Sequence, residues 1–171
     1  MKTKRCRDMD RNNKGYTLIE LIITLAILTI ITTGAVAMAS RITFADTTKA
    51  AKIVDSTMDK LRLETMTKST KQYLHLYTYD NSIYIKVSDK SDPSLAGLDS
   101  DSGKKIGGRM SVYYIGASGT EELLGTDNSI VIGFERSSGA FSSDYDTIRF
   151  EYGGKSSTIY CIKATGRHYV S

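Results

Sequence analysis

The sequence is short of the residues on which most catalytic and metal sites depend. It holds two histidines, two cysteines, one proline and no tryptophan among its 171 residues. His75 and His168 lie far apart, neither has an aspartate–serine pattern beside it, and both are expected to be surface residues of strands. The sequence therefore predicts no catalytic residues, no metal ligands and no cofactor, and we expect the protein not to be an enzyme.

The two cysteines exclude a framework of disulfides. Cys6 lies near the N-terminus and Cys161 near the C-terminus. If the N-terminal segment is removed, Cys161 has no partner within the chain. Nothing near Cys161 in the sequence supplies the histidine that a catalytic thiol needs. We therefore expect Cys161 to be a small, buried apolar side chain in a strand.

An excess of positive charge is missing from most of the chain. Residues 1–15 contain six basic and two acidic residues, which accounts for the whole formal net charge of +4. From Tyr16 onward, 17 basic residues face 17 acidic ones. The sequence pI of about 9.0 is therefore no evidence for a nucleic-acid-binding surface on the rest of the chain. A basic segment in front of an apolar one is instead a topology signal that keeps the basic segment in the cytoplasm.

Residues 16–40 form a long apolar run with a single charge, Glu20. As a helix these 25 residues would span about 37 Å, enough for a bilayer core of about 30 Å. In lipid a helix is required, because every backbone polar group must be satisfied within the segment. We therefore expect a basic leader at residues 1–15, followed by a transmembrane helix at residues 16–40.

Residues 41–71 show the pattern of an amphipathic helix. Apolar residues recur at three- to four-residue spacing, as at Ala50, Val54, Met58 and Leu61, with charged residues between them. The single proline, Pro93, lies far beyond this segment. We therefore expect one continuous helix that runs from the apolar segment to residue 71.

From residue 72 onward the period changes from helical to alternating, which predicts strands. Residues 73–79 and 83–87 flank the turn signal Asp80-Asn81 and are expected to form a hairpin. Further strands are expected at 109–115, 129–136, 147–152, 157–163 and 168–170. The intervening loop at 90–105 contains Asp99 and Asp101, which suit either a calcium site or a solvated polar loop. The predicted fold is α+β, with the long N-terminal helix packed on a small antiparallel β-sandwich or curled β-sheet in residues 72–171.

The most informative motif lies at the start of the apolar run, in KGYTLIELIITLAIL from Lys14 onward. It resembles the cleavage and methylation motif of type IV pilins and type II secretion pseudopilins. Gly15 closes the basic leader, Tyr16 stands where the family usually has Phe, and Glu20 is the fifth residue counted from Tyr16. The resemblance implies that a prepilin peptidase cleaves between Gly15 and Tyr16 and that the new amine of Tyr16 is N-methylated. It also implies that Glu20 faces the N-terminal ammonium of a neighbouring subunit in the filament.

The resemblance implies a structural subunit whose partners are prepilin peptidase, other pilins or pseudopilins and, indirectly, an assembly platform and its ATPase. The precursor is expected to be a single-pass protein of the cytoplasmic (inner) membrane, inserted through residues 16–40, with its C-terminal domain outside the cytoplasm. After assembly it would belong to a pilus or pseudopilus. The sequence leaves open whether the filament secretes proteins, takes up DNA in competence or forms a surface pilus.

A different interpretation of the N-terminus stays open. Residues 37–40, Ala-Met-Ala-Ser, also fit the cleavage site of a Sec signal peptide. Cleavage near Ser40 would release a β-rich enzyme or binding domain, and an uncleaved anchor would hold the same domain at the membrane. Both alternatives leave Glu20 as an unexplained charge and make the Gly15-Tyr16 pair a coincidence.

The C-terminal part resembles the GspH/FimT branch of minor pseudopilins. The matching places are Phe134, Gly139, Ile148, Phe150, Ile159 and Gly166-Arg167. This resemblance implies a helix with two packed β-sheets, and a low-copy subunit near the filament tip.

The same resemblance raises the question of DNA binding. Some members of the branch bind DNA through a Gly-Arg-x-Arg pattern, whereas this chain has Gly166-Arg167-His168-Tyr169 and lacks the second arginine. We therefore expect Arg167 to be mainly structural, meeting carbonyls or an acidic neighbour at the sheet edge. DNA contact through Arg167 is the alternative, and we expect no DNA binding by this subunit alone.

Overall fold

The computed structural model describes residues 16–68, 70–91 and 103–171, apart from the side chains of residues 33–45. It contains one long helix, α1 (Leu18–Thr67), followed by nine strands in the described residues. The chain forms two compact units, Met1–Met38 and Ala39–Ser171. Gly15, Asp99 and Asp101 lie outside the described residues.

Helix α1 buries one stripe of side chains in the second unit. Ala50, Ala51, Val54, Met58 and Leu61 are at most 2% exposed, and they follow the three- to four-residue spacing of one helix face. The amphipathic helix predicted from the sequence is confirmed in this part of the chain. The helix ends at Thr67, however, before the predicted end at residue 71.

The end of α1 is stabilised by a distant side chain. The guanidinium of Arg136 donates a hydrogen bond of 2.7 Å to the carbonyl oxygen of Lys68, just beyond the last helical residue. The positive charge of Arg136 also interacts favourably with the negative, C-terminal end of the helix dipole. A side chain from the strand-containing part of the chain therefore helps to fix the point at which α1 ends.

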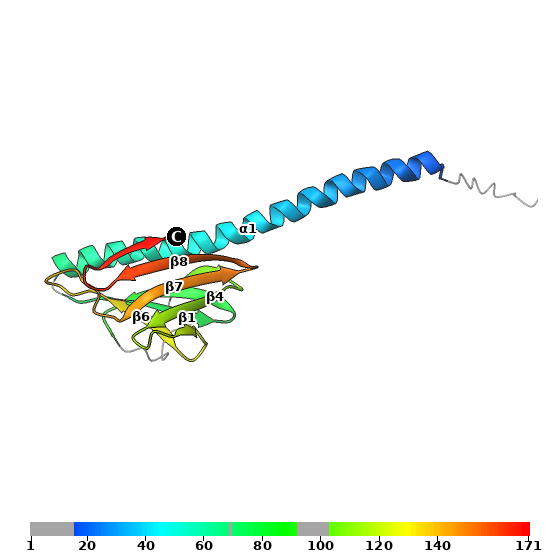
Figure 1. Ribbon diagram of the computed structural model, residues 1–171. Helices are drawn as coiled ribbons and strands as arrows, with labels where there is room; N and C mark the ends of the chain where they lie inside the picture. The colour runs from blue at the N-terminus through cyan, green and yellow to red at the C-terminus, as the bar shows by residue number, and fades with distance from the viewer. Residues whose placement is uncertain (1–15, 69, 92–102) are drawn as a thin grey trace, which may run out of the picture. The chain divides into compact units, whose positions relative to one another are not determined.

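The strands form two antiparallel sheets (Figure 1). The four-stranded sheet has the order β3-β2-β1-β6, with β1 Tyr73–Tyr79, β2 Ser82–Ser88, β3 Lys104–Gly108 and β6 Ser129–Gly133. The five-stranded sheet has the order β5-β4-β7-β8-β9. Its strands are β4 Ser111–Gly116, β5 Glu121–Leu123, β7 Tyr145–Tyr152, β8 Lys155–Ile162 and β9 Arg167–Val170.

The predicted hairpin is confirmed, and two strands were missed. Strands β1 and β2 pair in the register that a two-residue loop imposes, and Asp80 and Asn81 have φ values of 45° and 53°. Positive φ at both loop residues matches the twist of a tight hairpin. The missed strands, β3 and β5, lie at sheet edges, where two lysines or two glutamates replace an alternating apolar pattern. Charged edge strands are common because they discourage pairing with other chains.

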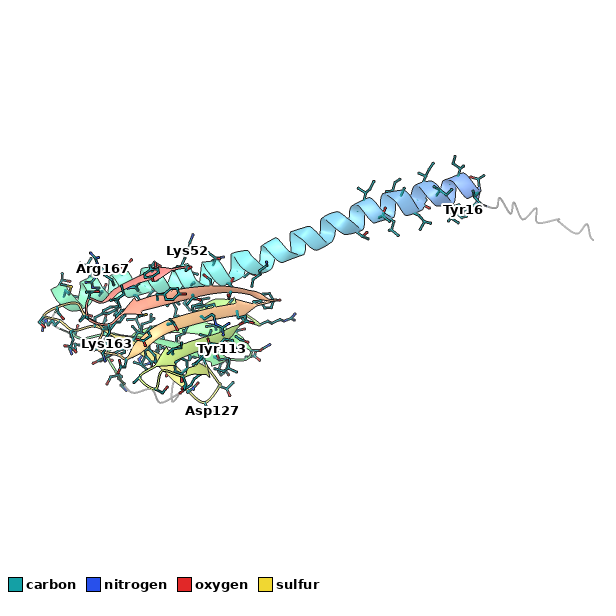
Figure 2. All side chains as sticks on the ribbon, viewed as in Figure 1. Tyr16, Lys52, Tyr113, Asp127, Lys163 and Arg167 are labelled. Atoms are coloured by element: carbon teal, nitrogen blue, oxygen red, sulfur yellow. The ribbon has the colours of Figure 1, made fainter. Side chains whose placement is uncertain are left out.

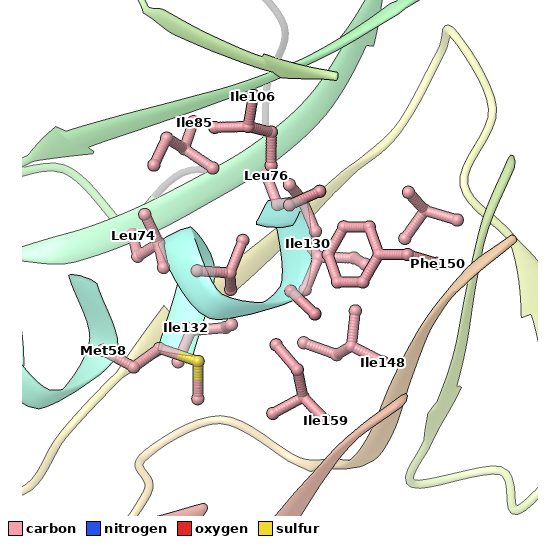
Figure 3. Packing of buried hydrophobic residues seen from close by; sticks show 14 of the residues in the cluster. Met58, Leu74, Leu76, Ile85, Ile106, Ile130, Ile132, Ile148, Phe150 and Ile159 are labelled. Atoms are coloured by element: carbon pink, nitrogen blue, oxygen red, sulfur yellow. The ribbon is translucent and has the colours of Figure 1, made fainter. Parts of the chain in front are cut away.

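Helix α1 and both sheets contribute to one hydrophobic core (Figure 3). The four-stranded sheet supplies Leu74, Leu76, Ile85, Ile130 and Ile132, and the five-stranded sheet supplies Val112, Ile148, Phe150 and Ile159. All residues of this core lie between Ala50 and Ile159. The predicted α+β architecture of a helix with antiparallel sheets is therefore confirmed, whereas closure of the sheets into a sandwich stays a prediction.

Arg62 connects α1 to two turns that are distant in the sequence. Its Nε donates a hydrogen bond of 2.9 Å to the carbonyl oxygen of Gly139, and its Nη2 donates one of 2.9 Å to that of Thr165. Gly139 and Gly166 both have positive φ, of 68° and 64°. The two glycines meet closely, because a Cβ at position 166 would lie 1.8 Å from the Gly139 carbonyl oxygen. Two of the positions that resemble the GspH/FimT branch therefore form one packed junction.

The expectation that both histidines are surface residues was wrong. His75 is 3% exposed, and its Nε2 lies 2.9 Å from both the Lys90 carbonyl oxygen and Ser88 Oγ. The side chain of His168 is 2% exposed. The reason in the first case is that β1 is an interior strand covered on both faces, and in the second that β9 lies against α1.

Candidate processing and assembly site

The first residues of α1 carry the motif found in the sequence (Figure 2). Tyr16, the predicted first residue of the mature chain, precedes the helix and is 83% exposed. The Thr17 carbonyl oxygen accepts hydrogen bonds of 3.1 Å and 3.2 Å from the amides of Glu20 and Leu21. Thr17 Oγ1 lies 3.4 Å from the Glu20 amide nitrogen and accepts from it. Thr17 is therefore the N-cap residue of the helix.

Glu20 lies in the first turn of α1 and is exposed. A carboxylate in the first turn interacts favourably with the positive, N-terminal end of the helix dipole. Thr17 and Glu20 also have the spacing of a capping box, in which a threonine is followed three residues later by a glutamate. The signal for this N-terminal cap was readable in the sequence, but only the assembly role of Glu20 was predicted from it.

The first half of α1 presents apolar side chains on all sides. The large aliphatic residues from Leu18 to Ile31 are between 51% and 80% exposed. Exposed apolar surface of this extent marks a site of contact with other proteins or with a membrane. The apolar side chains of this segment can therefore be buried only if the helix associates with other proteins or with a membrane.

The hydroxyl groups of this segment are paired within the helix itself. Thr24, Thr29 and Thr32 donate hydrogen bonds of 2.8–2.9 Å to backbone carbonyls three or four residues earlier. Burial of an unpaired hydroxyl in apolar surroundings is costly. Internal pairing makes the threonines compatible with such surroundings.

Within the part of the chain that the structure describes, no helix has the length and apolar character required to cross a membrane.

Comparison with known families identifies the N-terminal segment. Residues 10–36 match the family described as the prokaryotic N-terminal methylation motif. The matched range includes both sides of the predicted cleavage site and all of the capped first turn. This motif supports a type IV pilin-like precursor that is processed by a prepilin peptidase and assembles with other pilins. No curated protein and no solved structure matches the chain.

Arg167 begins strand β9 and is exposed at the surface (Figure 2). Its backbone amide donates a hydrogen bond of 3.4 Å to Thr165 Oγ1. Carbonyl contacts of the kind expected from Arg167 are made in this region by Arg62. Nearby Lys163 forms an ion pair with Asp144. The role of Arg167 stays a prediction.

Cys161 lies in β8 and is half-buried. Burial raises the pKa of its thiol to about 12, and the charges of Asp146 and Asp55 contribute in the same direction. The thiolate is the reactive form of cysteine. At neutral pH the group therefore stays a thiol and packs against the core as an apolar side chain.

Proposed function

We propose that this chain is a minor pilin or pseudopilin, a structural subunit of a type IV pilus-like or type II secretion filament. It is processed after Gly15, N-methylated on Tyr16 and assembled through its N-terminal helix and Glu20. The observation that carries this proposal is the methylation-motif match over residues 10–36. The exposed apolar surface of the first half of α1 supports it, because only association buries such a surface.

Glu20 has a specific task in this proposal. Cleavage creates an ammonium group on Tyr16, next to the positive end of the helix dipole. A carboxylate in a bilayer costs about 2.5–3.5 kcal/mol on insertion scales and needs a positive partner. In the filament, Glu20 of one subunit neutralises the ammonium of a neighbouring subunit. This pairing sets the axial register of the incoming subunit.

Within the wider family we propose the GspH/FimT branch. The support is that α1 and two antiparallel sheets share one core, as the resemblance implies. Gly139 and Gly166, two of the resembling positions, also meet at Arg62. In this proposal the chain is a low-copy subunit near the filament tip, and it has no enzymatic activity of its own.

The mature N-terminus distinguishes this proposal from secretion or anchoring of a β-rich enzyme or binding domain. The chain should be expressed with a prepilin peptidase in a bacterial host, and the N-terminus of the product determined by mass spectrometry. We expect a methylated Tyr16. A product that begins at Ser40 would instead establish a Sec-secreted domain, and an intact N-terminus in the presence of an active peptidase would establish a plain anchor.

Replacement of Glu20 tests the assembly role. Glu20→Ala should still be inserted and cleaved, because it removes a charge from an apolar segment. It should be at least about tenfold depleted from sheared filaments, since the neighbouring ammonium then lacks its partner. Glu20→Asp, which keeps the charge, is the control and should retain part of the assembly. Normal incorporation of Glu20→Ala would show that the ammonium-pairing account is wrong.

DNA binding by this subunit is a separate, negative prediction. Lys155 and Arg167 lie at opposite ends of the β8–β9 pair, and Lys163 is paired with Asp144. Non-specific binding is only about 10⁻⁴–10⁻⁶ M at physiological salt even for proteins with several phosphate contacts. We expect no salt-sensitive mobility shift of duplex DNA at micromolar protein. A clear shift that Arg167→Ala abolishes would favour a role in DNA uptake.

A further inference from the structure

The two sheets end in edge strands of opposite charge. Strand β3 is an edge of the four-stranded sheet and carries the exposed side chains of Lys104 and Lys105, the lysine edge. Strand β5 is an edge of the five-stranded sheet and carries the exposed side chains of Glu121 and Glu122, the glutamate edge. Among the described strands, β3 pairs only with β2, and β5 pairs only with β4. One side of each strand therefore presents backbone groups that no described strand pairs.

The positive charge of the lysine edge is not balanced by its surroundings. Within the described residues, neither Lys104 nor Lys105 takes part in an ion pair. Arg109 follows directly after β3 and is also exposed. The register of β3 with β2 is regular over both lysines and shifts only beyond Lys105. The lysine edge is therefore a regular, positively charged stretch that a further strand can extend.

The glutamate edge keeps a negative charge although its carboxylates have partners. Arg149 forms ion pairs with both Glu121 and Glu151. The Tyr114 hydroxyl donates a hydrogen bond of 2.8 Å to Glu122 Oε2. Burial and the neighbouring Glu122 raise the pKa of Tyr114 to about 12, so the phenol is neutral at neutral pH. Three carboxylates around one guanidinium leave this edge negative.

The opposite signs select one kind of contact between two copies. Two lysine edges repel each other, and so do two glutamate edges, because like charges directly opposite destabilise a strand pair. A lysine edge and a glutamate edge attract, and their free backbone groups can then complete a strand pair. Parallel, in-register pairing places each residue opposite one of complementary kind: Lys104 opposite Glu121, Lys105 opposite Glu122 and Ile106 opposite Leu123.

We propose that β3 of one copy pairs edge to edge with β5 of a second copy, so that the four-stranded sheet of one continues into the five-stranded sheet of the other. The contact is heterologous, and a pair of copies keeps one free lysine edge and one free glutamate edge. Since β5 has three residues, the contact is short and forms only where copies are held close together. The inference rests on the proposed function in this respect alone, because membrane insertion or assembly supplies that proximity.

Crosslinking of full-length copies tests the contact. Two differently tagged copies, both with Cys6→Ser and Cys161→Ser, are coexpressed in a bacterial host that lacks a prepilin peptidase, so failed processing cannot affect the result. One copy carries Lys105→Cys and the other Glu122→Cys, and a short bismaleimide is added to intact membranes. We expect about fivefold more crosslinked dimer than when both copies carry Lys105→Cys or both carry Glu122→Cys.

Charge variants separate edge pairing from random collision. In the copy with Lys105→Cys, Lys104→Glu should lower the yield to that of the same-edge combinations, whereas Lys104→Arg should keep it. Lys155→Glu, at an exposed lysine that begins β8, is the matched control and should leave the yield unchanged. Equal yields from unlike-edge and same-edge combinations, or no crosslink at all, would overturn the proposal. An undiminished yield with Lys104→Glu would overturn it as well.

Discussion

Gly15→Val should leave the precursor uncut when it is expressed with a prepilin peptidase. A peptidase that recognises an extended segment at the membrane surface needs a small residue before the scissile bond, and glycine adopts backbone conformations that a β-branched residue disfavours. The parent chain should lose residues 1–15 under the same conditions. Intact mass and the mobility difference on a gel distinguish the two products.

Gly15→Ala is the matched control for this experiment. It adds a single methyl group and no branching, so it should be cut more efficiently than Gly15→Val. Efficient cutting of Gly15→Val at Tyr16 would show that the residue before the bond does not restrict cleavage. The processing part of the proposed function would then lose its main sequence argument, whereas the packing of the β-domain would be unaffected.

Gly166→Ala should destabilise the β-domain severely. The new Cβ would lie 1.8 Å from the Gly139 carbonyl oxygen and 3.2 Å from Arg62 Nε, so backbone has to move. The φ of 64° is also a conformation that alanine disfavours, by about 1–2 kcal/mol. Overpacking adds about 1–3 kcal/mol. We expect a loss of about 2–5 kcal/mol in the free energy of unfolding, a large share of the usual total.

Gly154→Ala separates the two costs. Gly154 has a φ of 73°, but a Cβ at this position meets nothing within 4 Å. It should therefore lose only the conformational part, about 1–2 kcal/mol. Urea unfolding of a fragment from residue 41 to residue 171, which includes the whole core, measures both variants. Equal losses in Gly154→Ala and Gly166→Ala would contradict the close approach of the two turns.

Short-range patterns were read correctly from the sequence. The spacing of Ala50, Val54, Met58 and Leu61 predicted the buried helix face, and Asp80-Asn81 predicted the hairpin turn. These features depend on local geometry, because the period of a helix or strand decides which residues share a face. The edge strands β3 and β5 were missed because their sequences, KKIGG and EEL, lack the alternation of apolar and polar residues by which a strand is recognised.

The candidate processing site could be proposed from the sequence because its residues are neighbours in the chain, and it stays a prediction. Gly15, Tyr16 and Glu20 were identified from the motif, and the family match covers all three. The N-cap role of Thr17 was not predicted, although its spacing to Glu20 carried the signal. Glu20 was interpreted only as an assembly residue, so its position in the first, capped turn of α1 was not predicted.

The sequence by itself determined the processing motif, the helix with its buried face, and the change to strands after residue 72. All of these depend on residues that are close together in the chain. The tertiary structure alone decided the environments of Arg62 and His168. Arg62 meets carbonyls 77 and 103 residues away, and His168 meets a carbonyl 113 residues away. No local pattern encodes such partners, because they become neighbours only when two sheets and a helix bury a common core.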